Sequence, residues 1–246
     1  MAKRAEVPDH ERLGTRSKPC YIDLNATPAR QAREIASIFA PSSTLSSSND
    51  GEVFFQFLDG GIIGAPPSQD PQTKRWKRSS LVISGTVDFP PSFTKLSEAL
   101  NMKIVSPNIG SASTLKLSFA ALTKGLTALS ILSFSTAERE SVLPELLEHL
   151  EEYSPHTAAL CTSGVTGMPP KAYRWVEEMR GIGEASDTEG SWRGLGERVY
   201  GAFAELYHTV AGETVLGEER VGKRSRGKTV EDVAQIMARN RDSKKE

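Results

Sequence analysis

Cysteine is scarce in this sequence, with only Cys20 and Cys161 among 246 residues. Two cysteines so far apart do not make a disulfide framework, which indicates a reducing, cytoplasmic compartment. The polar first 18 residues lack the apolar stretch of a secretory signal, and no run approaches the roughly 18 apolar residues of a membrane-spanning helix. These absences predict a soluble, cytoplasmic protein.

An excess of charge of one sign is also missing: 30 basic and 31 acidic residues give a net charge of -1. This balance gives no reason to expect nucleic acid or a membrane as a partner. Two basic runs, residues 222–228 and the C-terminal RNRDSKKE, would suit a nucleic-acid contact, but such runs are more often solvated. The histidines lack metal-ligand spacing, so no metal is expected.

Glycine is missing where a dinucleotide-binding protein needs it. Gly14, in a charged and non-periodic stretch, is the only glycine before residue 51. A strand–GxGxxG–helix unit, whose glycines let a pyrophosphate reach a helix N-terminus, is therefore not found. A Walker loop and a nucleophile elbow are absent as well.

The first half of the chain alternates strand and helix patterns. Residues 1–18 predict a flexible arm, and the domain that follows spans 19–108. Its expected strands are 20–24, 54–58, 81–85 and 103–105, and its expected helices are 29–39 and 90–100. Residues 66–79 are expected to form a polar, cationic loop. This alternation predicts an α/β domain with a parallel sheet.

The second half has helical periodicity throughout. Apolar residues from Leu115 to Leu129 recur at helical spacing, which predicts a helix of about 25 residues after Gly110. Further helices are expected at 143–153, 171–179 and 192–206. The helical domain is therefore placed at 109–221. A basic linker and a terminal amphipathic helix with Thr229 as a possible N-cap fill 222–246.

Five blocks then resemble one family in order and spacing. They are YIDLNATPA (21–29), FLDGGIIGAPP (57–67), LVISG (81–85), IGSASTLKLSFAALTKGLTAL (109–129) and PPKAYRWVEEM (169–179). Over roughly residues 20–210 the chain resembles the β-hydroxyacid / 6-phosphogluconate dehydrogenase superfamily, in the branch with a distinctive C-terminal helical domain. The resemblance implies α/β plus all-α architecture, a truncated Rossmann-like sheet followed by the helical domain.

The resemblance also implies a function. It points to an NAD(P)-dependent oxidoreductase acting on a small hydroxy acid or related carbonyl compound, in a specialised metabolic pathway and as a homodimer. Members of the family begin with three strands that this chain lacks, so its first strand becomes a sheet edge, which another segment or subunit should cover. The alternative is a non-redox or pseudo-enzyme descendant that serves as a dimerising or ligand-binding protein.

Lys116 is the catalytic residue that the resemblance implies, as general acid/base at the substrate hydroxyl. It lies about one turn into the long helix, where the positive end of the helix dipole disfavours the ammonium form. From the residues alone, a solvated lysine opposite the leucine stripe remains open.

The resemblance places substrate-binding residues in two segments. Asp59, Gly60 and Gly61 occupy the family's glycine-containing substrate loop, although a tight turn without ligand is equally compatible. Thr123 and Lys124 share a helical face with Lys116. Two positions depart from the family, with Ala120 where many members have asparagine and Ile63 where a serine is frequent.

Cofactor contacts, to NAD or NADP, are implied for four residues. Asn25, Thr27 and Pro28 match the turn beside the nicotinamide ribose, and Arg174 lies near the family's second basic residue. Helix capping by Thr27 with Pro28 in the first turn, and a surface role for Arg174, explain them equally well.

Overall fold

The computed structural model describes residues 19–25, 27–39, 56–86, 89 and 93–242, so the predicted arm (1–18) lies outside the described residues. The α/β part contains β1 (Cys20–Asp23), α1 (Ala29–Ile38), β2 (Gln56–Ile63), β3 (Ser68–Gln69), β4 (Trp76–Lys77), β5 (Ser80–Ser84), α2 (Phe93–Ala99) and β6 (Met102–Ser106). The helical part contains α3 (Ser111–Arg139), α4 (Leu143–Tyr153), α5 (Pro155–Gly167), η2 (Pro169–Lys171), α6 (Ala172–Thr188), α7 (Leu195–Glu213), η3 (Val215–Glu218) and α8 (Val230–Asp242).

The four-stranded sheet has the order β1-β2-β5-β6. β1–β2 and β5–β6 are parallel pairs, but β2 and β5 are antiparallel. The expectation of a wholly parallel sheet is therefore wrong at its centre. The chain between β2 and β5 turns straight back instead of crossing over through a helix, and such a connection requires antiparallel strands.

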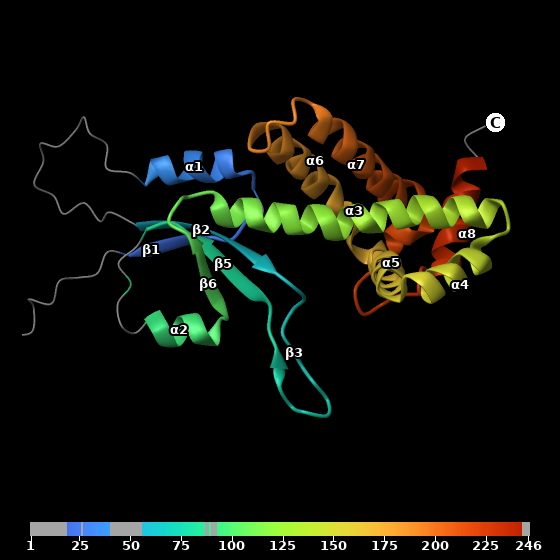
Figure 1. Cartoon of the computed structure of the whole chain (residues 1–246), viewed down its shortest axis with the longest axis horizontal. Coiled ribbons are helices and arrows are strands. Elements are labelled where there is room, and N and C mark those ends of the chain that lie inside the picture. Colours follow the sequence, from blue (N-terminus) through green and yellow to red (C-terminus); the bar gives the residue numbers. More distant parts are fainter. Residues whose placement is uncertain (1–18, 26, 40–55, 87–88, 90–92, 243–246) are drawn as a thin grey trace, which may run out of the picture.

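Two further expectations for this region need correction. Residues 66–79 are not simply a loop, because β3 and β4 pair within them and extend the β2–β5 hairpin into an arm that projects from the sheet (Figure 1). Asp59, Gly60 and Gly61 do not lie in a loop either, since β2 continues through them to Ile63. Their environment is therefore that of an interior strand.

The start of α1 differs from the sequence-based expectation. Pro28, not Thr27, is the N-cap residue, and no side-chain capping hydrogen bond is present there. A partner distant in sequence takes over instead, because the carboxylate of Glu189 accepts a hydrogen bond of 2.9 Å from the backbone N–H of Arg30. This contact joins the start of α1 to the end of α6.

The helical part is organised around α3, which runs almost the full length of the molecule (Figure 1). Its C-terminal half packs with α5 and α8, and the fully buried side chains there include Ile131, Phe134 and Val165. Helix α8 begins as expected, since Thr229 Oγ1 accepts a hydrogen bond of 3.2 Å from the backbone N–H of Asp232. The predicted fold class, α/β plus all-α, is confirmed.

By length and composition alone, α3 is apolar enough to cross a membrane, with a mean hydropathy of 1.5 over an 18-residue window. This corrects the expectation that no run approaches that limit. The signal is weak evidence, because the core helix of a soluble protein passes the same test and 44% of the window is buried inside the molecule.

Candidate functional site

The start of α3 is tied to the sheet by a buried carboxylate. Asp59 Oδ2 accepts hydrogen bonds from the backbone N–H groups of Gly110 and Ser113, both at 3.0 Å, and from Ser84 Oγ at 2.8 Å. Ser113 Oγ donates to Asp59 Oδ1, and Ser84 Oγ accepts from the N–H of Ala112 at 3.0 Å. Asp59 thus acts as a helix cap supplied by a strand, and it fixes the first turn of α3.

The two glycines after Asp59 allow close approach of neighbouring elements. A Cβ atom on Gly60 would lie 2.7 Å from Leu24 Cδ2, and one on Gly61 would lie 2.9 Å from Lys116 Cβ. The side-chain stem of Lys116 therefore rests directly on the strand. Lys116 is half-buried in this position, and burial lowers the pKa of its amine.

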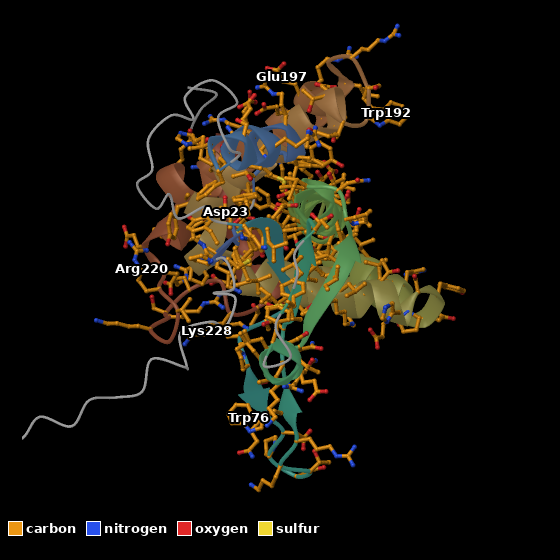
Figure 2. The ribbon with its side chains drawn as sticks, turned by 90° about the vertical axis from the view of Figure 1, so that its left-hand side faces the viewer. Asp23, Trp76, Trp192, Glu197, Arg220 and Lys228 are labelled. Carbon is orange, nitrogen blue, oxygen red and sulfur yellow. The ribbon has the colours of Figure 1, made fainter. Side chains whose placement is uncertain are left out.

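The turn after β1 lies beside the same glycines. Asp23 and Asp59 occupy equivalent positions of two parallel neighbouring strands. Asp23 Oδ1 accepts two hydrogen bonds from Asn25. The backbone N–H of Asn25 donates one at 3.1 Å, and its side-chain Nδ2 donates the other at 2.5 Å. Figure 2 shows Asp23 below α1 near the middle of the molecule, whereas Trp76 lies on the projecting arm. Leu24, between Asp23 and Asn25, packs against Gly60, so the chain leaves β1 next to the glycine segment.

Two turns further along α3, a second lysine lies in a more complex environment. Lys124 makes an ion pair with Glu178, and its amine stands 5.3 Å from the ring centre of Trp175. Tyr207 packs edge-on against Trp175 and donates a hydrogen bond of 2.6 Å to the backbone carbonyl of Lys124. Burial raises the pKa of Tyr207.

Cations gather around Lys124. Burial, together with the positive charges of Lys116, Arg174 and Lys171, lowers the pKa of Lys124 to about 7, while the contact with Glu178 favours its charged form. Lys116, Lys171 and Arg174 make no ion pair within the part of the chain that the structure describes. One carboxylate, Glu178, thus faces four basic groups, and the arrangement favours a bound anion.

A hollow of about 400 Å³ adjoins this group of cations, where α3, α5 and α6 meet. Thr123, Lys124 and Lys171 contribute polar groups to its lining, while Leu126 and Leu160 are among its apolar residues. We call it the α5 hollow. Lys116 and Asp59 do not line it. The structure therefore separates the predicted residues into one set around Lys116 and another around Lys124.

The residues described here do not fit the pyrophosphate of a dinucleotide. Such a group binds free N–H groups at a helix N-terminus. At α3 these groups donate to Asp59 and Ser84, and at α1 the N–H of Arg30 donates to Glu189. Within the described ranges there is also no cluster of three or more metal-ligating side chains.

Comparisons with known proteins agree with this fold. Residues 137–210 match a family described as a domain of unknown function, DUF1932. No curated protein sequence matches the chain. Among solved structures, a conserved hypothetical protein from Sinorhizobium meliloti 1021 is similar at 19% identity with a TM-score of 0.61, covering 90% of this chain and 66% of that one.

Two enzymes are also similar. The 3-hydroxyisobutyrate dehydrogenase from Salmonella typhimurium has 16% identity and a TM-score of 0.51, covering 89% of this chain and 70% of that one. The 3-hydroxyisobutyrate dehydrogenase from Mycobacterium tuberculosis, solved with L-serine, has 11% identity and a TM-score of 0.50, covering 92% and 71%.

The chain therefore has the fold of the hydroxyacid dehydrogenases. This confirms, for the fold, the resemblance to the β-hydroxyacid / 6-phosphogluconate dehydrogenase superfamily. The chain spans about two thirds of the length of the solved structures that it matches.

Three residues around Lys124, namely Lys171, Trp175 and Glu178, are not among the residues predicted from the sequence. Lys171, Arg174, Trp175 and Glu178 follow one another at spacings of three, one and three residues, which places them on one helical face. That spacing was visible in the PPKAYRWVEEM block. Of these four, the sequence predicts only Arg174, as a cofactor contact, and the structure brings it close to Lys124.

Proposed function

We propose that the chain works in an NAD(P)-dependent oxidoreductase of the β-hydroxyacid dehydrogenase type, acting on a small hydroxy acid or related carbonyl compound. The observation that carries the proposal is the position of Lys116. Its stem packs on Gly61 one turn into α3, and the adjacent Gly60 packs on Leu24, which follows β1. Ligands of open α/β sheets bind at the carboxyl ends of parallel strands, which is where Leu24 lies.

Lys116 is suited to move the proton of a substrate hydroxyl. A lysine accepts a proton only in its neutral form, and partial burial against the strand makes that form more accessible. The rigid support of α3 by Asp59 holds the side chain in place. On oxidation of a hydroxy acid, Lys116 Nζ would take the hydroxyl proton, and on reduction of the carbonyl compound it would return it.

An acidic substrate agrees with the surrounding charge. Lys171 and Arg174 lie within electrostatic reach of Lys124, and neither has an acidic partner among the described residues. A substrate carboxylate would relieve the mutual repulsion of these cations, since opposite charges a few ångströms apart attract strongly where water is partly excluded. Thr123 does not add to this attraction, because its only hydroxyl proton is donated to the carbonyl of Phe119 at 3.1 Å.

The cofactor, NAD or NADP, is proposed from the fold. Its nicotinamide end would lie at Asn25, Thr27 and Pro28, in the segment that follows Leu24, whose side chain packs on Gly60. Its pyrophosphate would have to be held by residues other than those described, because the nearby helix N-termini are already occupied. The proposed contacts therefore concern the nicotinamide end of the cofactor only.

The test uses the whole chain with NAD or NADP and a panel of small hydroxy acids, including 3-hydroxyisobutyrate and L-serine. Lys116→Met should lower turnover by about 10²- to 10⁴-fold, the usual contribution of a positioned acid or base. The exposed Lys95→Met on α2 is the matched control and should retain full activity. Equal activity of the Lys116 and Lys95 variants would refute the assignment.

A non-redox, ligand-binding descendant is the second candidate. It is favoured by the occupied helix N-termini and by Ala120, which is buried and offers no polar group to a substrate. Cofactor fluorescence separates the two candidates. Binding of NADH or NADPH below millimolar concentration supports the first. No binding at that concentration, together with retained hydroxy-acid binding, supports the second.

We also propose that the protein is a cytoplasmic homodimer that uses the outer face of α3. Leu115, Leu122 and Leu129 follow one another at seven-residue intervals, and all three are exposed, Leu122 by 78%. A heptad seam of exposed leucines is typical of helix–helix association. Sedimentation of the full chain as a monomer at tens of micromolar would rule this out.

A further inference from the structure

We propose that the α5 hollow binds a carboxylate with an apolar tail, with the carboxylate at Lys124 and Lys171 and the tail against Leu126 and Leu160. The proposal deepens the proposed function by naming a substrate class, and it rests on that function only where the bound acid is also taken to react. The volume of about 400 Å³ lies in the range of small-molecule sites.

The positive charge at the polar end of the hollow favours binding of an anion. Lys171, in η2, directly precedes α6, so the positive end of the α6 dipole adds to its own charge. Lys124 is largely buried, with 13% of its side chain exposed, and its contact with Glu178 offsets one of the neighbouring positive charges. A single carboxylate bound between Lys124 and Lys171 would offset a second of these positive charges.

The rest of the hollow favours binding of an apolar group. Leu160 is 48% exposed although α5 otherwise packs against α3 and α4, and Trp175 adds an aromatic surface. Burying such surface against hydrocarbon is favourable at about 25 cal/mol per Å². The hollow thus has positive charge at one end and hydrocarbon at the other, which matches an amphipathic acid. Neither end alone would distinguish such an acid from a simple anion or a simple hydrocarbon.

Small residues on α5 make the room for this tail. A Cβ atom on Gly164 would lie 2.5 Å from Thr127 Oγ1, so the hollow is closed at that point. A Cβ atom on Gly167, the last residue of α5, would meet nothing within 4 Å. The open space of the hollow is therefore next to Gly167, and a larger side chain there would fill it without a clash.

The experiment measures binding of acetate, butanoate, hexanoate and octanoate to the full chain by titration calorimetry, without cofactor. Affinity should rise about fourfold per methylene until the hollow is filled, as expected for burial of CH₂ groups. Gly167→Leu should weaken hexanoate and octanoate at least tenfold and acetate less than twofold. Lys124→Met should weaken all four acids about tenfold.

Gly181→Leu is the matched control. Gly181 lies within α6, a Cβ atom there also meets nothing within 4 Å, and the residue does not line the α5 hollow. Its alkanoate affinities should equal those of the unchanged chain. Equal affinities for all four acids, or equal behaviour of the Gly167 and Gly181 variants, would overturn the proposal.

Two outcomes separate this proposal from the proposed function. Chain-length-dependent alkanoate binding without turnover of any hydroxy acid supports the α5 hollow and refutes the redox activity, whereas turnover without such binding does the opposite. If Gly167→Leu changes the sedimentation coefficient and leaves alkanoate affinity unchanged, a second copy of the chain occupies the hollow and the proposal fails.

Discussion

The two ends of α3 are held in different ways. At its start, Asp59 and Ser84 from the sheet bind the free N–H groups of the first turn. At its far end, Ile131 and Phe134 are enclosed by apolar side chains of the helical core. Directional hydrogen bonds fix the position of a helix end closely, whereas apolar packing contributes stability without strong directional preference.

This difference accounts for where the candidate site lies. Lys116 follows the hydrogen-bonded turn directly, so its orientation depends on Asp59 and on the missing side chain of Gly61. Functional groups need positions accurate to fractions of an ångström. We infer that the polar end of α3 serves the site and the apolar end serves the stability of the fold.

The largest effect is expected at the apolar end. Phe134→Ala should lower the free energy of unfolding by about 4 kcal/mol, because it removes a fully buried ring and leaves a cavity. Chemical denaturation measures this change. Alkanoate affinity in the α5 hollow should stay within twofold of the unchanged chain, and a parallel loss of binding would show that the two ends are not independent.

The next effect is expected at the polar end. Asp59→Ala should lower the free energy of unfolding by about 3 kcal/mol, since it leaves buried N–H and hydroxyl groups without their charged acceptor. Asp59→Asn keeps the shape and one acceptor oxygen, so its loss should be smaller. Unlike Phe134→Ala, both variants should also lower the turnover that depends on Lys116. Full turnover in Asp59→Ala would remove the proposed link between the cap and the site.

The sequence predicted well where the cause is local. The periodicity of the leucines and the position of Gly110 predicted a long helix starting there, and α3 begins at Ser111. Thr229 was expected to cap the last helix, and its hydroxyl accepts the expected hydrogen bond. In both places the residues that determine the structure are within four positions of one another.

The sequence failed where the cause is distant. Asp59 looked like a loop residue because its partners Ser84, Gly110 and Ser113 are 25 to 54 positions away. The cap of α1 was assigned to Thr27, whereas Glu189, 159 positions from Arg30, supplies the carboxylate. Helix α5 was overlooked since its buried residues Ala158, Cys161 and Val165 are small and lie among polar ones. Such pairings follow from packing and leave no local pattern.

Lys124 lies where the two environments of α3 meet, and it gives the smallest expected effect. In the unfolded chain its amine keeps the usual pKa of 10.5, and in the folded chain the pKa falls to about 7. Between these values the unfolded chain binds the extra proton, so the stability of the unchanged protein rises with pH. Below pH 7 the folded chain carries the full penalty of burying an ammonium group.

Lys124→Met should therefore stabilise the protein below pH 7 by about 1 to 2 kcal/mol, with the gain vanishing as the pH approaches 10.5. One unit of pKa shift corresponds to about 1.4 kcal/mol, and loss of the contact with Glu178 offsets part of it. Thermal unfolding at pH 6, 8 and 10 measures the trend, with the exposed Lys95→Met as control. A variant that is less stable than the unchanged chain at pH 6 would mean that Glu178 outweighs burial. Lys124 would then resemble Asp59, because each would be a buried charge that its contacts stabilise.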